Sequence, residues 1–162
     1  MNKALQALGS GVAGACALTV IHQTAKRVTD KAPRADILGM RAIARTMRRA
    51  GGDPPPDDQL FWWSLVGDLV SNSLYDSLAA VGKGDRAWLR GGLLGLGAGV
   101  GAVALPGPLG LGTRPTNRTR ATQVMTIAWY LAGGLAAAAT ARCLARVGEE
   151  RDRFVGPEGA RA

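Results

Sequence analysis

The chain has 162 residues, of which 47% are hydrophobic, and a formal net charge of +8. This length fits one domain and leaves no room for a separate soluble domain beside a membrane domain. The positive charge does not indicate nucleic acid, because the basic residues lie between apolar runs and form no basic stripe interleaved with aromatics. Phospholipid headgroups are therefore the expected partners of these charges.

Three long runs, residues 4–25, 91–113 and 121–141, carry no charged side chain. Each run reaches the length of about 20 helical residues that crosses the hydrocarbon layer. We predict an all-α fold in which residues 1–162 form a single membrane domain, a bundle of four transmembrane helices with one short amphipathic surface helix. The expected location is multi-pass, in a bacterial inner membrane. The transmembrane helices are expected at about residues 4–24, 60–81, 86–105 and 121–144.

The first predicted helix ends at Lys26 and Arg27, whose long side chains can reach the headgroups. A basic start at Lys3 and small residues before Cys16 are features of a signal peptide, but the polar and glycine residues ahead of them make a poor apolar region. We therefore favour a retained helix. His22 is interpreted as a polar residue that closes this helix at the membrane surface, and a pH-sensitive group is the alternative.

Residues 26–59 form a basic connection that contains a helical pattern. Between residues 36 and 50, apolar side chains recur at helical spacing and arginines occupy the remaining surface. This pattern predicts an amphipathic helix lying on the membrane, with its arginines on lipid headgroups. The alternative is a solvated helix packed on its own protein. The arginines are Arg41, Arg45, Arg48 and Arg49.

The predicted helix over residues 60–81 contains an acid near its middle, Asp68. A charged residue at that depth costs roughly 2.5 to 3.5 kcal/mol. It must therefore face other helices or a water-filled cavity. At about 100° per residue, Asp68 shares a narrow sector with other polar side chains, which we predict to line a polar path. The members of this path are Ser64, Asp68, Ser71, Asn72 and Tyr75.

Residues 82–85 predict a tight turn, so the helices on either side of it are expected to form an antiparallel hairpin. Asp76 lies close to this turn and is expected to face headgroups or water. The next predicted helix, residues 86–105, carries glycines at four-residue spacing, which lets neighbouring backbones approach closely. The partner helix could belong to the same chain or to a second copy. The two glycine lines are Gly91, Gly95 and Gly99, and Gly97 with Gly101.

The last predicted helix, residues 121–144, has a small and weakly polar face suited to close packing. Just before it, Arg118 and Arg120 are candidates for a headgroup contact at the helix N-terminus. A plain turn is the alternative for these two residues. The tail, residues 146–162, has mixed charge and is expected to be a frayed, flexible end.

The sequence offers no familiar catalytic motif. One histidine and two distant cysteines do not make a zinc site, and we expect no metal and no cofactor. An enzyme would have to use an isolated acid such as Asp68 on a lipid-soluble substrate. The leading hypothesis is a channel- or transporter-like module with a polar path centred on Asp68. The alternative is a non-catalytic assembly or scaffold subunit, and in either case we expect self-association or other membrane subunits.

Overall fold

The structure is a computed structural model that describes residues 2–82 and 84–155. This described part is helical and contains no strand, which confirms the predicted all-α class for these residues. Two short 3-10 helices, η1 (Leu78–Ala80) and η2 (Gly84–Arg86), join the third and fourth α-helices. The α-helices are α1 (Lys3–Val28), α2 (Ala35–Arg49), α3 (Asp57–Ser77), α4 (Ala87–Ala104), α5 (Arg114–Asn117) and α6 (Arg120–Val155).

Three of the four predicted spans have the length and composition of transmembrane helices. α3, which contains most of the predicted span over residues 60–81, is not one of them, because Asp68, Asn72 and Asp76 interrupt its apolar residues. A bundle of four membrane spans is therefore not established by length and composition alone. Within the described residues, the segments long and apolar enough to cross a membrane are Lys3–Val28, Gly84–Ala104 and Arg120–Glu150.

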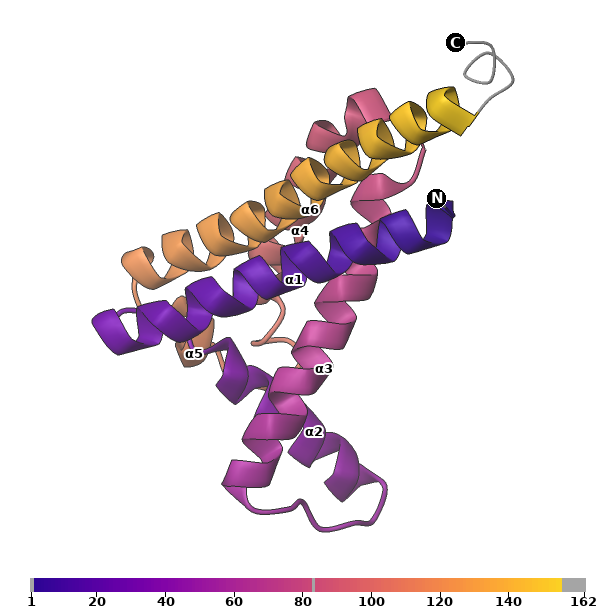
Figure 1. Cartoon of the computed structure of the whole chain (residues 1–162). Helices are drawn as coiled ribbons and strands as arrows, with labels where there is room; N and C mark the ends of the chain where they lie inside the picture. The colour runs from indigo at the N-terminus through magenta and orange to yellow at the C-terminus, as the bar shows by residue number, and fades with distance from the viewer. Residues whose placement is uncertain (1, 83, 156–162) are drawn as a thin grey trace.

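The three long apolar helices form the body of the molecule. α1 and α6 lie side by side in opposite directions, and α4 packs on α6 behind them (Figure 1). α3 crosses α1 obliquely, so that its first half leans away from this body. There it packs against α2, and the two form a lobe at the bottom of the view. The candidate site consists of a groove between α3 and α4 and a smaller cavity between α1, α2 and α3.

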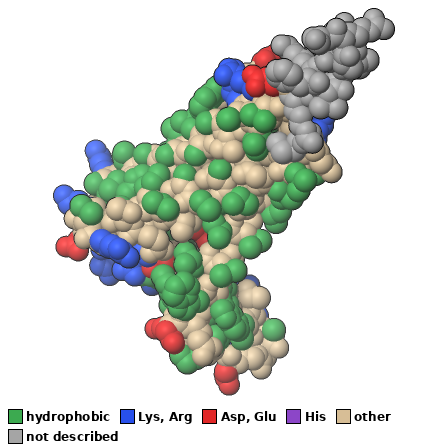
Figure 2. Space-filling view, in the orientation of Figure 1, with side chains coloured by type: hydrophobic (Ala, Val, Ile, Leu, Met, Phe, Trp, Pro, Cys, Tyr) green, Lys and Arg blue, Asp and Glu red, His purple; other side chains and the backbone are tan. Residues whose placement is uncertain are grey.

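Large apolar side chains cover the outside of this body, while small and polar side chains fill its interior. Hydrophobic side chains spread over the surface of α1 and α6 in Figure 2, and most of the visible basic ones lie at the end where α1 finishes. Soluble proteins normally bury their leucines and valines. The reverse distribution suits helices surrounded by lipid. Exposed members include Leu5, Leu8, Val12, Val20, Leu89, Leu93, Leu96 and Val100, and buried ones include Ser10, Thr116, Thr122, Thr126, Ala15 and Ala137.

The α4–α6 contact is made backbone to backbone through glycines. Gly91, Gly95 and Gly99 are all buried on the face of α4 that meets α6. A Cβ atom added at Gly95 would lie 2.6 Å from the carbonyl oxygen of Tyr130, and one at Gly91 would meet the carbonyl of Gly134. These separations are too short for any side chain. The partner of this glycine line is therefore a helix of the same chain.

A second close crossing brings α1, α3 and α6 together around Asp76. This carboxyl is 5% exposed, and a Cβ at Gly14 would lie 2.7 Å from its Oδ2 atom and 2.8 Å from the carbonyl oxygen of Gly133. Because both glycines lack side chains, they leave room for the carboxyl between α1 and α6. The expectation that Asp76 faces headgroups or water is therefore wrong.

Hydrogen bonds tie the first connection to the start of α6. The Arg34 backbone N–H donates to the Pro115 carbonyl at 2.8 Å, and Thr122 Oγ1 donates to the Lys31 carbonyl at 3.0 Å. Arg118 donates to the carbonyl of Asp30. This connection is therefore fixed at one end of the helical body, where α1 ends and α6 begins.

Two arginines fasten α2 to the connection after α4. Arg41 donates to the Leu111 carbonyl at 2.7 Å, and Arg45 donates to the Gly110 carbonyl at 2.8 Å. Gly110 has a φ of 68°, in the left-handed region that glycine adopts without strain. These contacts hold the α2–α3 lobe against the main body.

The helix bounds depart from the predicted ones mainly after residue 105. α5 lies between the predicted helices over residues 86–105 and 121–144, where no helix was predicted. α6 continues to Val155, although residues from 146 onward were expected to fray. No proline occurs between Arg120 and Val155, and Gly148 is buried beside Gln6, so the helix has a packing partner there. Residues 156–162 of the predicted tail lie outside the described part of the chain.

Candidate functional site

α3 distributes the predicted polar path over two cavities. Asp68 is half-buried and lines both of them. Ser64, one helical turn earlier, lines only a small cavity between α1, α2 and α3. Ser71, Asn72 and Tyr75 line only a larger groove between α3 and α4. The five side chains therefore do not share one surface, and Asp68 is where the two cavities meet.

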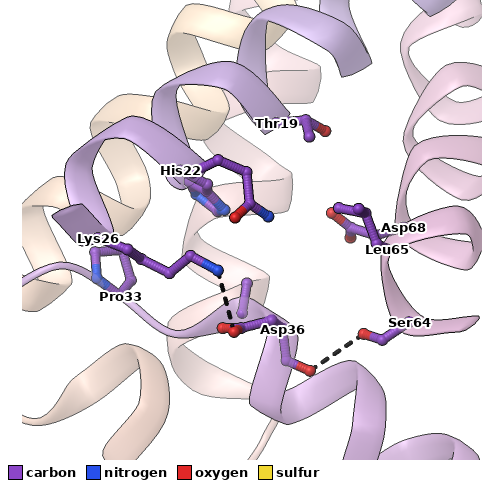
Figure 3. Close-up of a pocket in the computed structure, with 10 residues that line it drawn as sticks. Thr19, His22, Lys26, Pro33, Asp36, Ser64, Leu65 and Asp68 are labelled. Carbon is purple, nitrogen blue, oxygen red and sulfur yellow. Dashed lines mark hydrogen bonds and ion pairs between the residues drawn. The ribbon is translucent and has the colours of Figure 1, made fainter. Parts of the chain in front are cut away.

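The small cavity has a volume of about 20 Å³ and is surrounded by polar and charged side chains. α1 contributes His22 and Lys26, α2 contributes Asp36, and α3 contributes Ser64 and Asp68 (Figure 3). A cavity of roughly 10 to 15 Å³ is enough for one water molecule if polar partners are present. The small cavity therefore has the size and the lining of a water site.

Asp36 is the electrostatic centre of one wall of the small cavity. Its carboxylate accepts from Lys26 Nζ at 3.1 Å and from Arg34 at 3.2 Å. Burial alone would raise the pKa of Asp36, but these hydrogen bonds and charges outweigh it and hold the pKa below its usual value. The Asp36 backbone carbonyl accepts from Ser64 Oγ at 3.1 Å, which joins α2 to α3. Asp36 therefore stays ionised and fixes Lys26 in place.

His22 is a buried member of the same wall, and not a helix-closing residue at the surface as interpreted from the sequence. It is 7% exposed, and its ring lies 5.1 Å from the Trp129 ring and 5.8 Å from the Tyr130 ring. Its Nε2 atom and the Thr19 Oγ1 atom are both buried without a hydrogen-bond partner among the described residues. Both residues line the small cavity, so that cavity is where these atoms can find a partner.

The groove between α3 and α4 is much larger, about 550 Å³, and is widely open. Asp68, Ser71 and Asn72 give it a polar side on α3, and Tyr75 Oη donates to the Leu94 carbonyl of α4 at 3.2 Å. The other walls are mostly apolar. They include Leu38 and Ala42 of α2, Ala98 and Ala102 of α4, and Leu105 and Leu109 of the following connection.

The second glycine line belongs to this groove. Gly97 and Gly101 line it, and a Cβ at either position would meet no backbone within 4 Å outside its own helix. The nearest atom to such a Cβ at Gly97 is Tyr75 Oη, at 3.7 Å. Within the described chain, this line therefore faces open space and not a packed helix.

The predicted headgroup residues lie in three different settings. Arg41 and Arg45 donate to backbone carbonyls after α4, and Arg118 donates to a carbonyl before α2. Arg48 and Arg49 are exposed at the end of α2, and Arg120 is exposed at the start of α6. The structure therefore gives internal contacts to three of these six arginines.

Sequence reasoning missed most of the small cavity. Thr19, His22 and Lys26 recur at three- and four-residue steps, so a search for a polar face on the first helix would have grouped them. Asp36 gave no comparable signal, because the return of the chain from α1 to α2 cannot be read from spacing. The burial of Asp76 depends on glycines of two other helices and could not be predicted from the sequence either.

The arrangement can hold water, exchange protons or bind a small cation. Within the described residues, no group of three or more His, Cys, Asp or Glu side chains is placed to hold a metal ion. Comparisons with protein-family models, curated proteins and solved structures find no match to this chain. Its function therefore has to be inferred from this geometry.

Proposed function

We propose that the chain is a multi-pass membrane protein, a channel- or transporter-like module whose polar path is centred on Asp68. The observation that carries the proposal is the position of Asp68, which lines both the water-sized cavity and the open groove. An acid placed between two cavities can exchange a proton or a cation with each of them. Intramembrane acids usually mark such pathways.

The membrane location is supported by the distribution of side chains. Leucines and valines lie outside on α1 and α4, while threonines, serines and alanines lie inside. In water, such a surface would be an aggregation liability. In a bilayer, which we take to be a bacterial inner membrane, the same surface meets acyl chains. We place α1, α4 and α6 across the membrane and α3 as a fourth, oblique crossing sheltered by α1.

The open groove implies a partner. A path for polar species must be closed off from lipid, because polar groups facing hydrocarbon without partners are costly. The described chain leaves the groove between α3 and α4 widely open. We propose that a second copy or another membrane subunit completes its wall. Light scattering in mild detergent tests this, and a lone monomer that still transports would contradict it.

Flux measurements in liposomes test the transport function. The full chain is reconstituted, and a pH-sensitive dye and ion-sensitive electrodes follow protons, K⁺ and Na⁺. We expect Asp68→Asn to abolish most of the flux, because the amide keeps the shape but cannot ionise. The matched control is Asp57→Asn, an exposed acid in the first turn of the same helix. Equal flux in both variants, or no flux in the unaltered protein, would overturn the proposal.

Two observations favour the scaffold alternative: the apolar walls of the groove and, among the described residues, the absence of backbone opposite Gly97 and Gly101. Glycine lines of this kind let a helix of another protein pack closely. A pure assembly subunit would form a complex and show no flux. Cysteine cross-linking at Gly101 with flux assayed in parallel separates the two functions.

A further inference from the structure

The small cavity holds two buried polar atoms that nothing else in the described chain satisfies. His22 Nε2 and Thr19 Oγ1 have no hydrogen-bond partner there, and both side chains line this cavity. Figure 3 shows Asp68 facing the cavity from α3, across from His22 on α1. Buried polar groups in native proteins almost always have a partner, supplied by ordered water when the protein supplies none.

The volume and charge of the cavity favour water over a metal cation. Its volume of about 20 Å³ suits one water molecule. Asp36 is already paired with Lys26 and Arg34, so this cluster has no surplus negative charge. The hydroxyl of Ser64 is engaged with the Asp36 carbonyl. Too few free oxygen atoms remain for the six or more ligands that a cation such as Ca²⁺ takes.

We propose that a water molecule in this cavity links Asp68 to His22, so that the two form a proton relay and the proton is the species that the path carries. This inference rests on the proposed transport function and names its substrate. Asp68 takes a proton from water in the groove on its other side. His22 exchanges protons with the end of the cavity lined by Lys26.

The transfer balances as a single proton shift. The O–H bond of protonated Asp68 breaks while a new O–H bond forms on the bridging water. That water in turn gives up another proton to His22 Nε2, where an N–H bond forms. A neutral acid and a neutral imidazole become a carboxylate and an imidazolium. The imidazolium then releases a proton to water at the Lys26 end, and the carboxylate takes up a new proton from the groove, which restores both groups. No oxidant, reductant or further reactant is needed.

The groups around His22 determine how this relay responds to pH. Lys26 faces it from the same helix, Asp36 from α2, Asp68 from α3 and Tyr130 from α6. Because Lys26 is paired with Asp36, the charge state of Asp68 is the variable that changes across the transport cycle.

The first test measures proton flux in liposomes under an imposed pH gradient, with the full chain. We expect His22→Gln to lower proton flux by about tenfold or more, because without the imidazole a charge would have to cross dry protein. We expect Thr19→Val, which removes one hydroxyl and keeps the shape, to lower it by a smaller factor. Asp57→Asn is the control and should match the unaltered protein.

The outcomes separate this inference from the proposed function. If Asp68→Asn abolishes flux while His22→Gln leaves it intact, the path stands and the relay is overturned. If the chain carries K⁺ or Na⁺ and no protons, the proton is the wrong substrate. If the unaltered protein carries nothing, the transport function itself fails.

A second measurement does not depend on flux or on the folding of a His22 variant. His22 is the sole histidine in the chain, so ¹⁵N-histidine labelling gives the Nδ1 and Nε2 signals of a single imidazole in bilayers. We expect a hydrogen-bonded Nε2 whose shift changes in Asp68→Asn and stays constant in Asp57→Asn. If the Nε2 shift is the same in Asp68→Asn as in the unaltered protein, no water links the two side chains and the relay is overturned.

Discussion

The two sides of α4 show how one helix can serve a dry contact and an open cavity. On one side, Gly91, Gly95 and Gly99 lie against the α6 backbone, where no side chain or water fits. On the other, Gly97 and Gly101 line a groove of about 550 Å³. Both sides carry the same residue type at the same spacing. What differs is the element opposite, a tightly packed helix in one case and an oblique one in the other.

This difference teaches that glycine spacing predicts a face without saying what fills it. α6 lies close to α4 because Gly91, Gly95 and Gly99 let the two backbones meet. α3 diverges from α4 because its first half is held by α2, through Ser64 and the Asp36 carbonyl. The polar α1–α2–α3 region therefore creates the open side of α4.

Substitutions on the side of α4 that packs against α6 should have the largest effect on stability. We expect Gly95→Leu to lower the free energy of unfolding by about 3 kcal/mol or more, because the new side chain would collide with backbone that cannot move aside. The Tyr130 carbonyl lies 2.6 Å from the Cβ position. Loss of helical circular dichroism on heating in mild detergent measures this effect.

Gly92→Leu is the matched control, since its Cβ would meet nothing within 4 Å. Comparable destabilisation by both substitutions would mean that α4 and α6 do not meet at this face. It would then remove the distinction between the two sides of the helix.

The second largest effect on stability is expected in the polar region between α1, α2 and α3, from loss of the ion pair between Lys26 and Asp36. Asp36→Ala leaves Lys26 without its partner at a site where the Asp36 side chain is 8% exposed and the Lys26 side chain 16%. Breaking a buried pair is strongly destabilising, and we expect a loss of about 2 kcal/mol here because Lys26 retains some contact with water. Thermal unfolding beside an Asp53→Ala control, an exposed acid, measures it. Equal melting temperatures would show that the pair contributes nothing.

The same residue predicts a dependence on pH. Because the pKa of Asp36 is lower in the folded protein than its ordinary value of 3.8, its contribution to stability is complete above about pH 4. That contribution is lost as the pH falls through the lower folded value. The stability gap between the unaltered protein and Asp36→Asn should therefore shrink below about pH 4. A gap that stays constant from pH 6 to pH 3 would contradict the lowered pKa.

The sequence was most informative where a pattern is local. The periodicity of residues 36–50 predicts α2 to within a residue at each end, and the predicted span over residues 86–105 matches α4 equally well. α5 carried no such signal, because one helical turn is too short for periodicity. α6 extends beyond its predicted end because the charged residues of its last turns are compatible with a helix.

The candidate site shows the limit of the same reasoning. A helical wheel placed Asp68 beside Ser64 and Tyr75, but a wheel assumes that one neighbour covers the whole sector. Here α2 covers the Ser64 end and the groove opens at the Tyr75 end, so Asp68 lies between them. This division depends on where α2 packs on α3, which is a contact between residues distant in sequence.

The smallest expected change in stability comes from the open side of α4. We expect Gly97→Leu to leave the free energy of unfolding unchanged or to raise it by up to about 0.8 kcal/mol, because leucine favours a helix more than glycine does. Its Cβ would lie 3.7 Å from Tyr75 Oη, an ordinary contact, and the rest of the side chain would project into the groove. Flux should nevertheless fall several-fold, since the access of water to Asp68 is blocked. Gly97→Leu and Gly95→Leu thus place the same side chain two residues apart, and the first should lower transport while the second destabilises the fold. If Gly97→Leu keeps full flux, the groove is not the entrance to Asp68.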